Sequence, residues 1–437
     1  MRKTDILILG NGAAGSSAAF AAKQTAPELN VLVLSKEDEP VYSAPALPDL
    51  LSGELTRAQV TVSPWDDYRN AGIEALCASA VRIDAGTRTV ILENGGEVSY
   101  GELILATGSQ PIRLRKMQGT GLPGNFVMKT IADVEDMAAY GGSRAVVVGS
   151  GAIGIEGSMA LKARGFEQVV MVEALEWLSP KSLDRATSDE LKAKLESFGV
   201  KVLTGEAVQG VLGETKVEGV RTEKRDIPCD LILWGIGMRP DTELAKAAGI
   251  ECGASGAILT DDHMRTNLPH VYACGDCTES VDVFSGQRGA YLFWEPARRG
   301  GAAAGVNAAE EGQDVRQENR PRVFLGTTPF FLTNKGGLSI LAMGRTEAQL
   351  AEGRGTVLEE KKDGVYRRLL FEDGKLAGAQ MLGTLEDADL FAAQIRKNAM
   401  QREDTWDLTE PVPNLEQLSL QEAVFFLRKQ RRNAFSK

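Results

Sequence analysis

The stretch ILILGNGAAGSSAA, residues 6–19, contains the pattern that decides the fold. Residues 5–9 are typical of a buried parallel strand, and residues 16–25 form a run of small residues suited to a helix that packs closely on it. A second apolar strand, residues 31–34, follows at the spacing of a βαβ unit. The N-terminal part of the chain therefore predicts a parallel sheet with a helix on one face.

Three glycines lie between the first strand and its helix, at positions 10, 12 and 15. Glycines at this turn let the chain fold tightly and let a pyrophosphate reach the positive end of the helix. A lone glycine pattern also occurs in turns that bind nothing, but the strand, helix and strand around it favour a nucleotide site. We interpret the turn as a dinucleotide cradle.

The same pattern returns in AVVVGSGAIGIEGSMA, residues 145–160, with Gly149, Gly151 and Gly154. Its second strand, VVMVE, ends at Glu173. A carboxylate there can accept hydrogen bonds from both hydroxyls of an adenosine ribose, and it repels a 2′-phosphate. Both effects favour NADH over NADPH. The alternative is that Glu173 is a solvated strand end.

The first unit carries a different set of residues at the matching position. Ser35 ends its second strand, and the next acids are Glu37 and Asp38. A ribose could be held by Ser35 and Glu37, so we expect this unit to bind a different dinucleotide. Two such units predict two cofactors.

Composition narrows the class of protein. The chain has 437 residues, enough for about two to four domains, and its formal charge of −11 argues against a nucleic-acid partner. The apolar run near the N-terminus is too short for a signal peptide, and no run approaches the length of a membrane span. Five cysteines, an odd and mostly scattered set, suit a reducing compartment. We expect a cytoplasmic protein.

Three further stretches surround the second glycine pattern: LILATGSQP at residues 103–111, ILWGIGMRPDTEL at residues 232–244 and VYACGDCTES at residues 271–280. Together with the two glycine turns, these motifs resemble the two-dinucleotide flavoproteins, the pyridine nucleotide-disulfide oxidoreductases in the broad sense. The resemblance implies the cofactors FAD and NAD(H). It also implies an α/β fold of two Rossmann-like domains, with the FAD domain interrupted by the NAD domain, and an added C-terminal α+β domain.

The resemblance also implies where the domains and site residues lie. The expected bounds are 1–112 and 243–320 for the two FAD halves, 113–242 for the NAD domain and 321–437 for the C-terminal interface domain with its helical tail. The expected FAD-site residues are Gly10, Gly12, Ala13, Ala14, Gly15, Ser35, Lys36, Glu37, Ser43, Ala44, Pro45, Ala80, Val81, Ala106, Thr107, Gly108, Gly275, Asp276, Glu295, Pro296 and Ala297. The expected NAD(H)-site residues are Gly149, Gly151, Ala152, Ile153, Gly154, Glu173, Gly235 and Gly237.

Two of these residues have specific expected roles. Asp276 matches the aspartate that holds a ribityl hydroxyl of FAD, and the alternative for it is an ordinary Asx turn. Glu156 matches a glutamate near the nicotinamide, and we assign it positioning rather than proton transfer. Its alternative role is a salt bridge on the helix surface.

Residues 39–54, EPVYSAPALPDLLSGE, decide the expected chemistry. Members of the family that reduce disulfides, peroxide or oxygen resemble one another in that they carry a redox cysteine in this segment. This chain has Pro45 at the corresponding position. The segment looks instead like the Tyr-x-x-Pro-x-Leu stretch of ferredoxin and rubredoxin reductases. Those relatives often carry Arg at the position of Ala44 and Lys near Asp49, so a Lys–Glu pair beside the flavin cannot be assumed.

Cys274 and Cys277 form a CxxC pair, which raises a thioredoxin-like role. The motif already commits Gly275 and Asp276 to FAD, so we disfavour that role. With only two histidines, no iron–sulfur or zinc site is expected within this chain.

The last hundred residues change in character from about Val323. Strand-like stretches at 329–344 and 365–383, with EDGK as a hairpin turn, precede an amphipathic helix at 385–400. This resembles the family's C-terminal domain, which commonly packs in dimers or against a partner. In the tail, an apolar helix face of Leu418, Leu420, Val424, Phe425 and Leu427 precedes the basic residues Arg428, Lys429, Arg431 and Arg432. This tail suits docking to an acidic redox protein, or is a solvated helix end.

Taken together, the sequence predicts an enzyme that exchanges electrons between NAD(H) and an iron–sulfur protein or subunit through FAD. We expect the flavin subunit of a larger complex, such as an aldehyde or 2-oxoacid oxidoreductase. One alternative is a free-standing NADH oxidase or small-molecule reductase. Another is a redox-controlled interaction protein resembling apoptosis-inducing factor.

Overall fold

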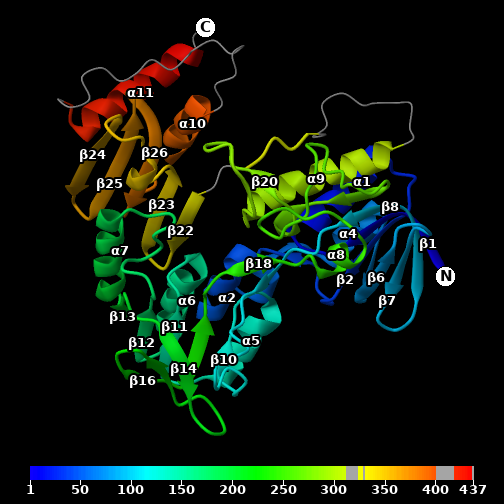
Figure 1. Ribbon diagram of the computed structural model, residues 1–437, viewed down its shortest axis with the longest axis horizontal. Helices are drawn as coiled ribbons and strands as arrows, with labels where there is room; N and C mark the ends of the chain where they lie inside the picture. Colours follow the sequence, from blue (N-terminus) through cyan, green and yellow to red (C-terminus); the bar gives the residue numbers. More distant parts are fainter. Residues whose placement is uncertain (312–322, 328–329, 400–417, 436–437) are drawn as a thin grey trace.

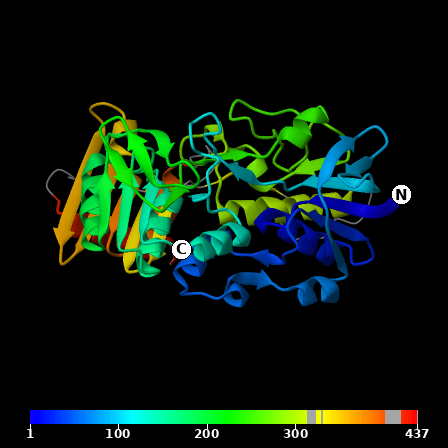
Figure 2. The ribbon, with the colours of Figure 1, turned by 90° about the horizontal axis from the view of Figure 1, so that it is seen from below.

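The computed structural model describes residues 1–311, 323–327, 330–399 and 418–435 (Figure 1). Three large sheets with their helices form the main parts of the described molecule, and we call these parts the first, second and C-terminal units. Figure 2 shows the second and C-terminal units side by side at one end of the molecule and the N-terminus at the other end.

The first unit is built on a seven-stranded sheet that the chain visits twice. Its central strands are parallel because helices cover them and connect them. A late strand, β19, pairs with β8, so residues on both sides of the second unit complete one sheet. The strands are β1 (Arg2–Leu9), β2 (Val31–Ser35), β5 (Ile73–Cys77), β6 (Ala80–Asp84), β7 (Thr89–Leu92), β8 (Glu97–Leu105) and β19 (Val271–Ala273).

Two helices of small residues, α1 (Ala13–Thr25) and α9 (Trp294–Glu310), pack against each other on this sheet (Figure 1). A Cβ at Gly301 or Gly305 would lie 2.1 Å from the carbonyl oxygen of Ala14 or Ala18, respectively. The two backbones therefore touch, which only glycine permits. This contact fixes the helix N-termini at one edge of the sheet.

The second unit repeats the plan around a five-stranded parallel sheet, in the order β10-β17-β11-β12-β13. Its strands are β10 (Asn125–Phe126), β11 (Arg144–Val148), β12 (Gln168–Val172), β13 (Val200–Leu203) and β17 (Leu231–Trp234). Its helices are α5 (Ile131–Tyr140), α6 (Ala152–Ala163) and α7 (Arg185–Ser197). A small antiparallel sheet, β14 (Val208–Leu212), β15 (Gly219–Thr222) and β16 (Asp226–Pro228), precedes the last strand.

Shorter elements connect the two units. Strands β9 (Ser109–Pro111) and β18 (Met238–Pro240) pair where the chain leaves the first unit and returns to it. The other short elements are β3 (Val41–Tyr42), η1 (Ala44–Ala46), α2 (Leu47–Ser52), α3 (Arg57–Val60), β4 (Thr61–Ser63), α4 (Trp65–Ala71), α8 (Glu243–Ala247), η2 (Gly275–Cys277), β20 (Ser280–Val281) and β21 (Arg288–Gly289).

The C-terminal unit is an antiparallel sheet in the order β22-β23-β26-β25-β24, covered by two helices. Its elements are β22 (Phe330–Lys335), β23 (Leu338–Gly344), η3 (Glu347–Gln349), β24 (Gly355–Lys362), β25 (Val365–Glu372), β26 (Lys375–Leu382), α10 (Ala388–Ala399) and α11 (Leu420–Phe435). The sequence predicted the two strand-like stretches, the EDGK turn between β25 and β26 and the helix α10, but not β24, because the polar residues of this edge strand lack an apolar alternation.

The tail helix α11 packs on its own unit. Leu420, Val424 and Leu427 are buried as the pattern predicted, whereas Phe425 is 71% exposed, so its assignment to the apolar face was wrong. The helix turns Ala423 inward instead. Arg428 forms ion pairs with Glu386 and Asp387 of the same unit, so this member of the basic cluster is neutralised within its own unit. The side chains of Lys429, Arg431 and Arg432 lie outside the described residues.

One hydrophobic core joins all three units. It contains Leu47 and Leu51 of α2, Leu161 of α6 and Phe331 of β22, together with much of the second unit's interior. The units are therefore packed on one another rather than strung on linkers. Within the part of the chain that the structure describes, no helix is both long enough and apolar enough to cross a membrane.

We expect Gly305→Ala to loosen the α1–α9 contact, because the added methyl group would meet the Ala18 carbonyl. Overpacking of this kind costs about 1–3 kcal/mol of unfolding free energy. Denaturant unfolding checks the value, with Ala302→Ser on the half-exposed side of α9 as a control that should stay near the parent. An unchanged midpoint for Gly305→Ala would contradict the backbone contact.

Candidate dinucleotide sites

The first glycine of each turn lets the chain pass beneath a neighbouring strand end. Gly10 has a φ of 112° and Gly149 a φ of 98°, backbone angles that residues with a side chain rarely adopt. A Cβ at Gly10 would lie 2.1 Å from the oxygen of Ala106, and one at Gly149 would lie 2.5 Å from the oxygen of Gly235. Two predicted site residues, Ala106 and Gly235, thus form the walls of the two turns.

The third glycine of each turn serves helix packing. A Cβ at Gly15 would lie 1.9 Å from the oxygen of Gly10, and one at Gly154 would lie 2.0 Å from the oxygen of Gly149. Each helix can therefore begin directly against its own turn. Both helix N-termini then face the carboxyl edge of their parallel sheets, where ligands of α/β folds bind.

The second glycine of each turn faces open space. Apart from the adjoining residues of the chain, no atom of the described residues lies within 4 Å of a Cβ built at Gly12 or Gly151, although the other two glycines of each turn are crowded. These two glycines begin α1 and α6, and no side chain caps either helix. Free backbone N–H groups beside such space are suited to a pyrophosphate, so both turns fit a dinucleotide.

Glu173 lies directly after β12 and is 9% exposed. Its Oε2 accepts hydrogen bonds from the backbone N–H of Ser150 at 3.0 Å and from the Ser150 hydroxyl, and its Oε1 accepts from Leu175 N–H at 2.9 Å. The carboxylate is thus tied to the glycine turn, which holds it at the edge of the cradle. Sequence reasoning missed Ser150.

The first unit holds a carboxyl at the matching edge. Ser35 Oγ accepts from Glu37 N–H at 3.2 Å, and the Tyr42 hydroxyl donates to Glu37 Oε2 at 2.8 Å. Burial raises the pKa of Glu37, and the hydrogen bond from Tyr42 opposes that rise. Lys36 is largely exposed and lies 3.9 Å from Asp241.

Asp276 lies near the first glycine turn, across from β9. The Ser109 hydroxyl donates to its Oδ2 at 2.8 Å, and the Lys129 ammonium lies 3.9 Å from the same oxygen. Burial raises the pKa of Asp276, whereas Lys129 and Ser109 act to lower it. Gly275, at a φ of 78°, passes close to Ala14. Residues from three segments of the chain therefore meet at one carboxyl, and sequence reasoning found neither Ser109 nor Lys129.

The remaining predicted residues lie on several elements of the first and second units. The Thr107 hydroxyl donates to the Asp241 carbonyl at 2.6 Å, at the crossing between the units. Gly108 and Gly237 have positive φ on either side of this crossing. Ser43, Ala44 and Pro45 form η1 and its cap, Ala80 and Val81 begin β6, Ala152 and Ile153 begin α6, and Glu295, Pro296 and Ala297 form the first turn of α9.

The CxxC pair is part of the core. Cys274 and Cys277 are 0% exposed, and the Cys277 thiol lies 3.2 Å from the Cys274 carbonyl oxygen. Burial raises the pKa of both thiols. A redox pair needs an accessible thiolate, so this geometry argues against a thioredoxin-like role.

Among the described residues, Glu156 on α6 has no salt-bridge partner on the helix surface. The Thr333 hydroxyl of β22 donates to its Oε1, and Lys335, two residues further on, pairs with Asp49 of α2. Burial raises the pKa of Glu156 to about 7. Lys335 and Thr333 come from the C-terminal unit, and nothing in the sequence indicated them.

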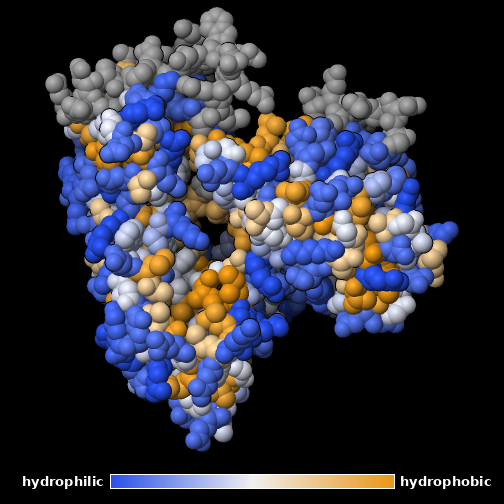
Figure 3. Space-filling view, viewed as in Figure 1, coloured by the Kyte–Doolittle hydropathy of each residue, from blue (hydrophilic) through white to orange (hydrophobic). Residues whose placement is uncertain are grey.

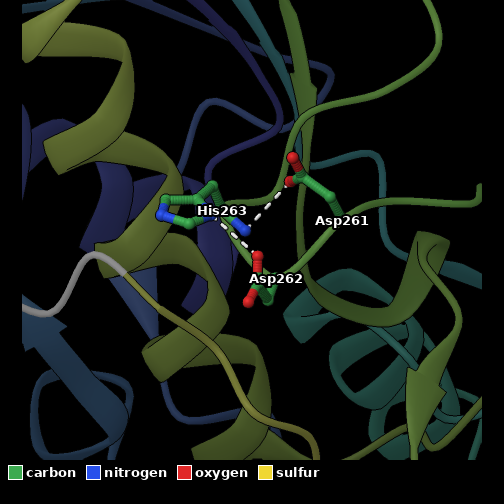
Figure 4. Close-up of side chains that lie close together, drawn as sticks. All are labelled: Asp261, Asp262 and His263. Carbon is green, nitrogen blue, oxygen red and sulfur yellow. Dashed lines mark hydrogen bonds and ion pairs between the residues drawn. The ribbon is translucent and has the colours of Figure 1, made fainter.

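Figure 4 shows a group of three side chains at a turn away from these edges: Asp261, Asp262 and His263. Asp261 Oδ1 accepts from the backbone N–H of His263 at 2.9 Å and of Arg265 at 2.8 Å. The His263 ring is 2.7 Å from Asp262. These bonds hold the turn that contains Met264 at positive φ, so we give the group a structural role.

Comparison with known proteins identifies the fold and its cofactors. The family model of the pyridine nucleotide-disulphide oxidoreductases matches residues 4–320. The chain belongs to this family. The resemblance found in the sequence is thus confirmed, as is the α/β fold in which one dinucleotide domain interrupts the other. Members bind FAD and NAD(P)H, and the chain is a flavoprotein oxidoreductase.

Three relatives illustrate the range of this family. An NADH oxidase of Methanocaldococcus jannaschii is 30% identical over 397 residues, which is 86% of this chain and 87% of the relative. A rubredoxin-NAD(+) reductase of Pseudomonas putida is 31% identical over 287 residues, or 64% and 74% of the two chains. A solved FAD-dependent pyridine nucleotide-disulphide oxidoreductase from Desulfovibrio vulgaris superposes with a TM-score of 0.73 at 26% identity, covering 92% and 96%.

We expect Gly12→Ala to weaken FAD binding without destabilising the apoprotein. Gly12 has a φ of −79°, which any residue adopts, and its missing Cβ points into open space. The methyl group would therefore meet only the cofactor. Titration of apoprotein with FAD should show a loss of at least tenfold in affinity, about 1.4 kcal/mol. Gly15→Ala is the matched contrast, because its clash with Gly10 should lower apoprotein stability itself. Full FAD affinity in Gly12→Ala would contradict the cradle.

We expect Glu173 to make the enzyme prefer NADH, because its carboxylate repels a 2′-phosphate and accepts hydrogen bonds from the ribose hydroxyls. The parent should favour NADH by about a hundredfold in kcat/KM. Glu173→Ala should narrow this gap, since it removes attraction and repulsion together. Ser150→Ala keeps the carboxylate and serves as the control. Equal kcat/KM for the two nucleotides in the parent would refute the assignment.

Proposed function

We propose that this chain exchanges electrons between NAD(H), bound at the second glycine turn, and an iron–sulfur protein or subunit, through FAD bound at the first. FAD supplies the conversion between hydride transfer and release of single electrons. Each cradle supplies a helix N-terminus and a carboxyl at the sheet edge, which suits a dinucleotide. The observation that carries the proposal is the chemistry of the segment that leads from β3 into α2.

That segment contains no sulfur. Pro45 lies in η1, where the relatives that reduce disulfides have their cysteine, and it cannot form a thiolate. Cys274, Cys277 and Cys229 are buried, and burial raises the pKa of each thiol. We infer that no thiol relays electrons from the flavin, and transfer to a separate protein is then the simplest route for them. The rubredoxin reductase of Pseudomonas putida and a ferredoxin–NAD(P)(+) reductase of Sphingomonas, 32% identical over 289 residues, support this type of acceptor.

In this proposal, side chains of the protein bind and orient the two cofactors. Glu173 holds the adenosine ribose of NAD(H), and Glu156 positions the nicotinamide. Asp276, with Ser109 and Lys129 beside it, holds the ribityl chain of FAD. The first turn of α9 directs its positive end toward the flavin, which favours negative charge there. We further propose that the iron–sulfur partner is a subunit of a larger oxidoreductase complex and that the chain acts in the cytoplasm.

A free-standing NADH oxidase is the competing function. The relative from Methanocaldococcus jannaschii, which aligns along most of both chains, favours it. The two functions differ in the acceptor, so kinetics separate them. An interaction protein resembling apoptosis-inducing factor would differ from both in turning over slowly with every acceptor.

The decisive experiment is native purification of the full chain from the cells that make it, followed by assay of what accompanies it. We expect a yellow protein with FAD and a co-purifying protein that contains iron and acid-labile sulfide. NADH should reduce that protein at least tenfold faster than it reduces oxygen, a difference of about 1.4 kcal/mol in barrier. Fast NADH turnover with oxygen alone would select the oxidase. Slow turnover throughout, with NADH-dependent oligomerisation, would select the interaction protein.

A cysteine-free variant is the control for the electron route. Cys77 and Cys252 are replaced by Ser and the three buried cysteines by Ala, which avoids burying an unpaired hydroxyl. Stopped-flow bleaching of the flavin by NADH should stay within about tenfold of the parent. A loss of several orders of magnitude in a folded variant would show that a thiol takes part.

A further inference from the structure

The three units meet at a small polar cluster inside the apolar core that joins them. Its members are Asp49 of α2 in the first unit, Glu156 of α6 in the second, and Thr333 and Lys335 of β22 in the C-terminal unit. Figure 3 shows that this face of the molecule is hollowed where the three units come together. We call these four residues the junction cluster.

The contacts in the junction cluster are specific. Lys335 and Asp49 form an ion pair in which their side chains are only 20% and 15% exposed. The Thr333 hydroxyl donates to Glu156. Thr333 and Lys335 alternate by two along β22, so both project from the same face of the strand. A single strand of the C-terminal unit therefore holds groups of both other units.

The hairpin that carries Lys335 is shaped to reach α6. Gly336 and Gly337 turn the chain between β22 and β23 with φ of 55° and 79°. A Cβ at Gly336 would lie 3.4 Å from the Met159 side chain, and one at Gly337 would lie 3.7 Å from the Phe198 ring. The hairpin tip thus packs on the second unit and fixes the position of Lys335.

The charges around Glu156 come from two neighbouring elements. Lys335 on β22 favours the ionised carboxyl, and Asp49 on α2 disfavours it. The other cations of α6 and its end face elsewhere: Lys162 binds the Phe166 and Glu167 carbonyls, and Arg164 binds the Leu51 and Ala138 carbonyls. On α5, which packs on α2, Asp133 caps its own helix and Glu135 pairs with Arg57. Among the described residues, the charges of Lys335 and Asp49 therefore determine the electrostatic potential at the Glu156 carboxyl.

We propose that Lys335 and Thr333 are positioning residues which the C-terminal unit contributes to the nicotinamide site, where with Asp49 they orient the Glu156 carboxyl and set its charge. The placement of Glu156 beside the nicotinamide rests on the proposed function. The C-terminal unit is then part of the nucleotide site and not only an interface.

The test measures the titration of Glu156 by NMR in the full FAD-loaded chain with ¹³C-labelled glutamate, the signal being assigned with Glu156→Gln. The parent should titrate with a pKa of about 7. Lys335→Gln should raise this pKa and Asp49→Asn should lower it, each by about 0.5 or more, because they remove charges of opposite sign. Thr333→Val should raise it by removing a hydrogen bond to the carboxylate.

The opposite signs separate a charge-setting role from a structural one. If the ion pair only held the units together, the two variants would loosen the same contact and shift the titration in the same direction or not at all, and the proposal would fall. Lys335→Arg keeps the positive charge, so it should leave the pKa of Glu156 close to the parent value. Lys362→Gln, an exposed lysine on β24 of the same unit, should leave it unchanged.

A binding measurement links the junction cluster to the nucleotide. NAD⁺ carries a positive nicotinamide ring, so its affinity should increase as pH rises through the pKa of Glu156. Isothermal titration with NAD⁺ should show this midpoint moving up in Lys335→Gln and down in Asp49→Asn. An affinity that follows neither variant would overturn the link to the nucleotide site. Neither measurement needs an electron acceptor, so a failure to find an iron–sulfur partner would overturn the proposed function alone.

Discussion

The contact between the third and first glycines of each turn is the constraint on which the rest of this structure depends. Gly15 lies against the carbonyl of Gly10, and Gly154 against that of Gly149, at distances that exclude any side chain. Because each helix starts against its own turn, its free N–H groups point at the sheet edge. The second glycine of each turn is then left facing open space, which suits a pyrophosphate.

The second level of organisation is the sharing of one core by three units. The helix α2 from the first unit and the hairpin β22–β23 from the C-terminal unit both pack on α6. The apolar contacts hold three sheets in fixed relation, so polar groups from each can meet. Burial in this core also raises the pKa of Glu156 into the neutral range, which makes its charge sensitive to its neighbours.

Sequence patterns predicted the two segments of strand, glycine turn and helix well because each is local. A strand, three glycines and a helix lie within about 20 residues, so their spacing carries the geometry. The tail helix shows the limit of such patterns: Phe425 follows Val424 in the chain, yet only Val424 is buried, because the position of the sheet decides which face turns inward. The edge strand β24 escaped prediction for a similar reason, since its polar residues become a strand only through pairing with β25.

The sequence by itself determined the two glycine turns and the carboxyl that follows β12 and, with the motifs at residues 103–111, 232–244 and 271–280, the family. Only the tertiary structure decided what surrounds the carboxyls of Asp276, Glu156 and Asp49. Ser109 reaches Asp276 from 167 positions away, Thr333 reaches Glu156 from 177, and Lys335 reaches Asp49 from 286. Such meetings follow from how the units pack, and side-chain periodicity within one segment carries no information about them.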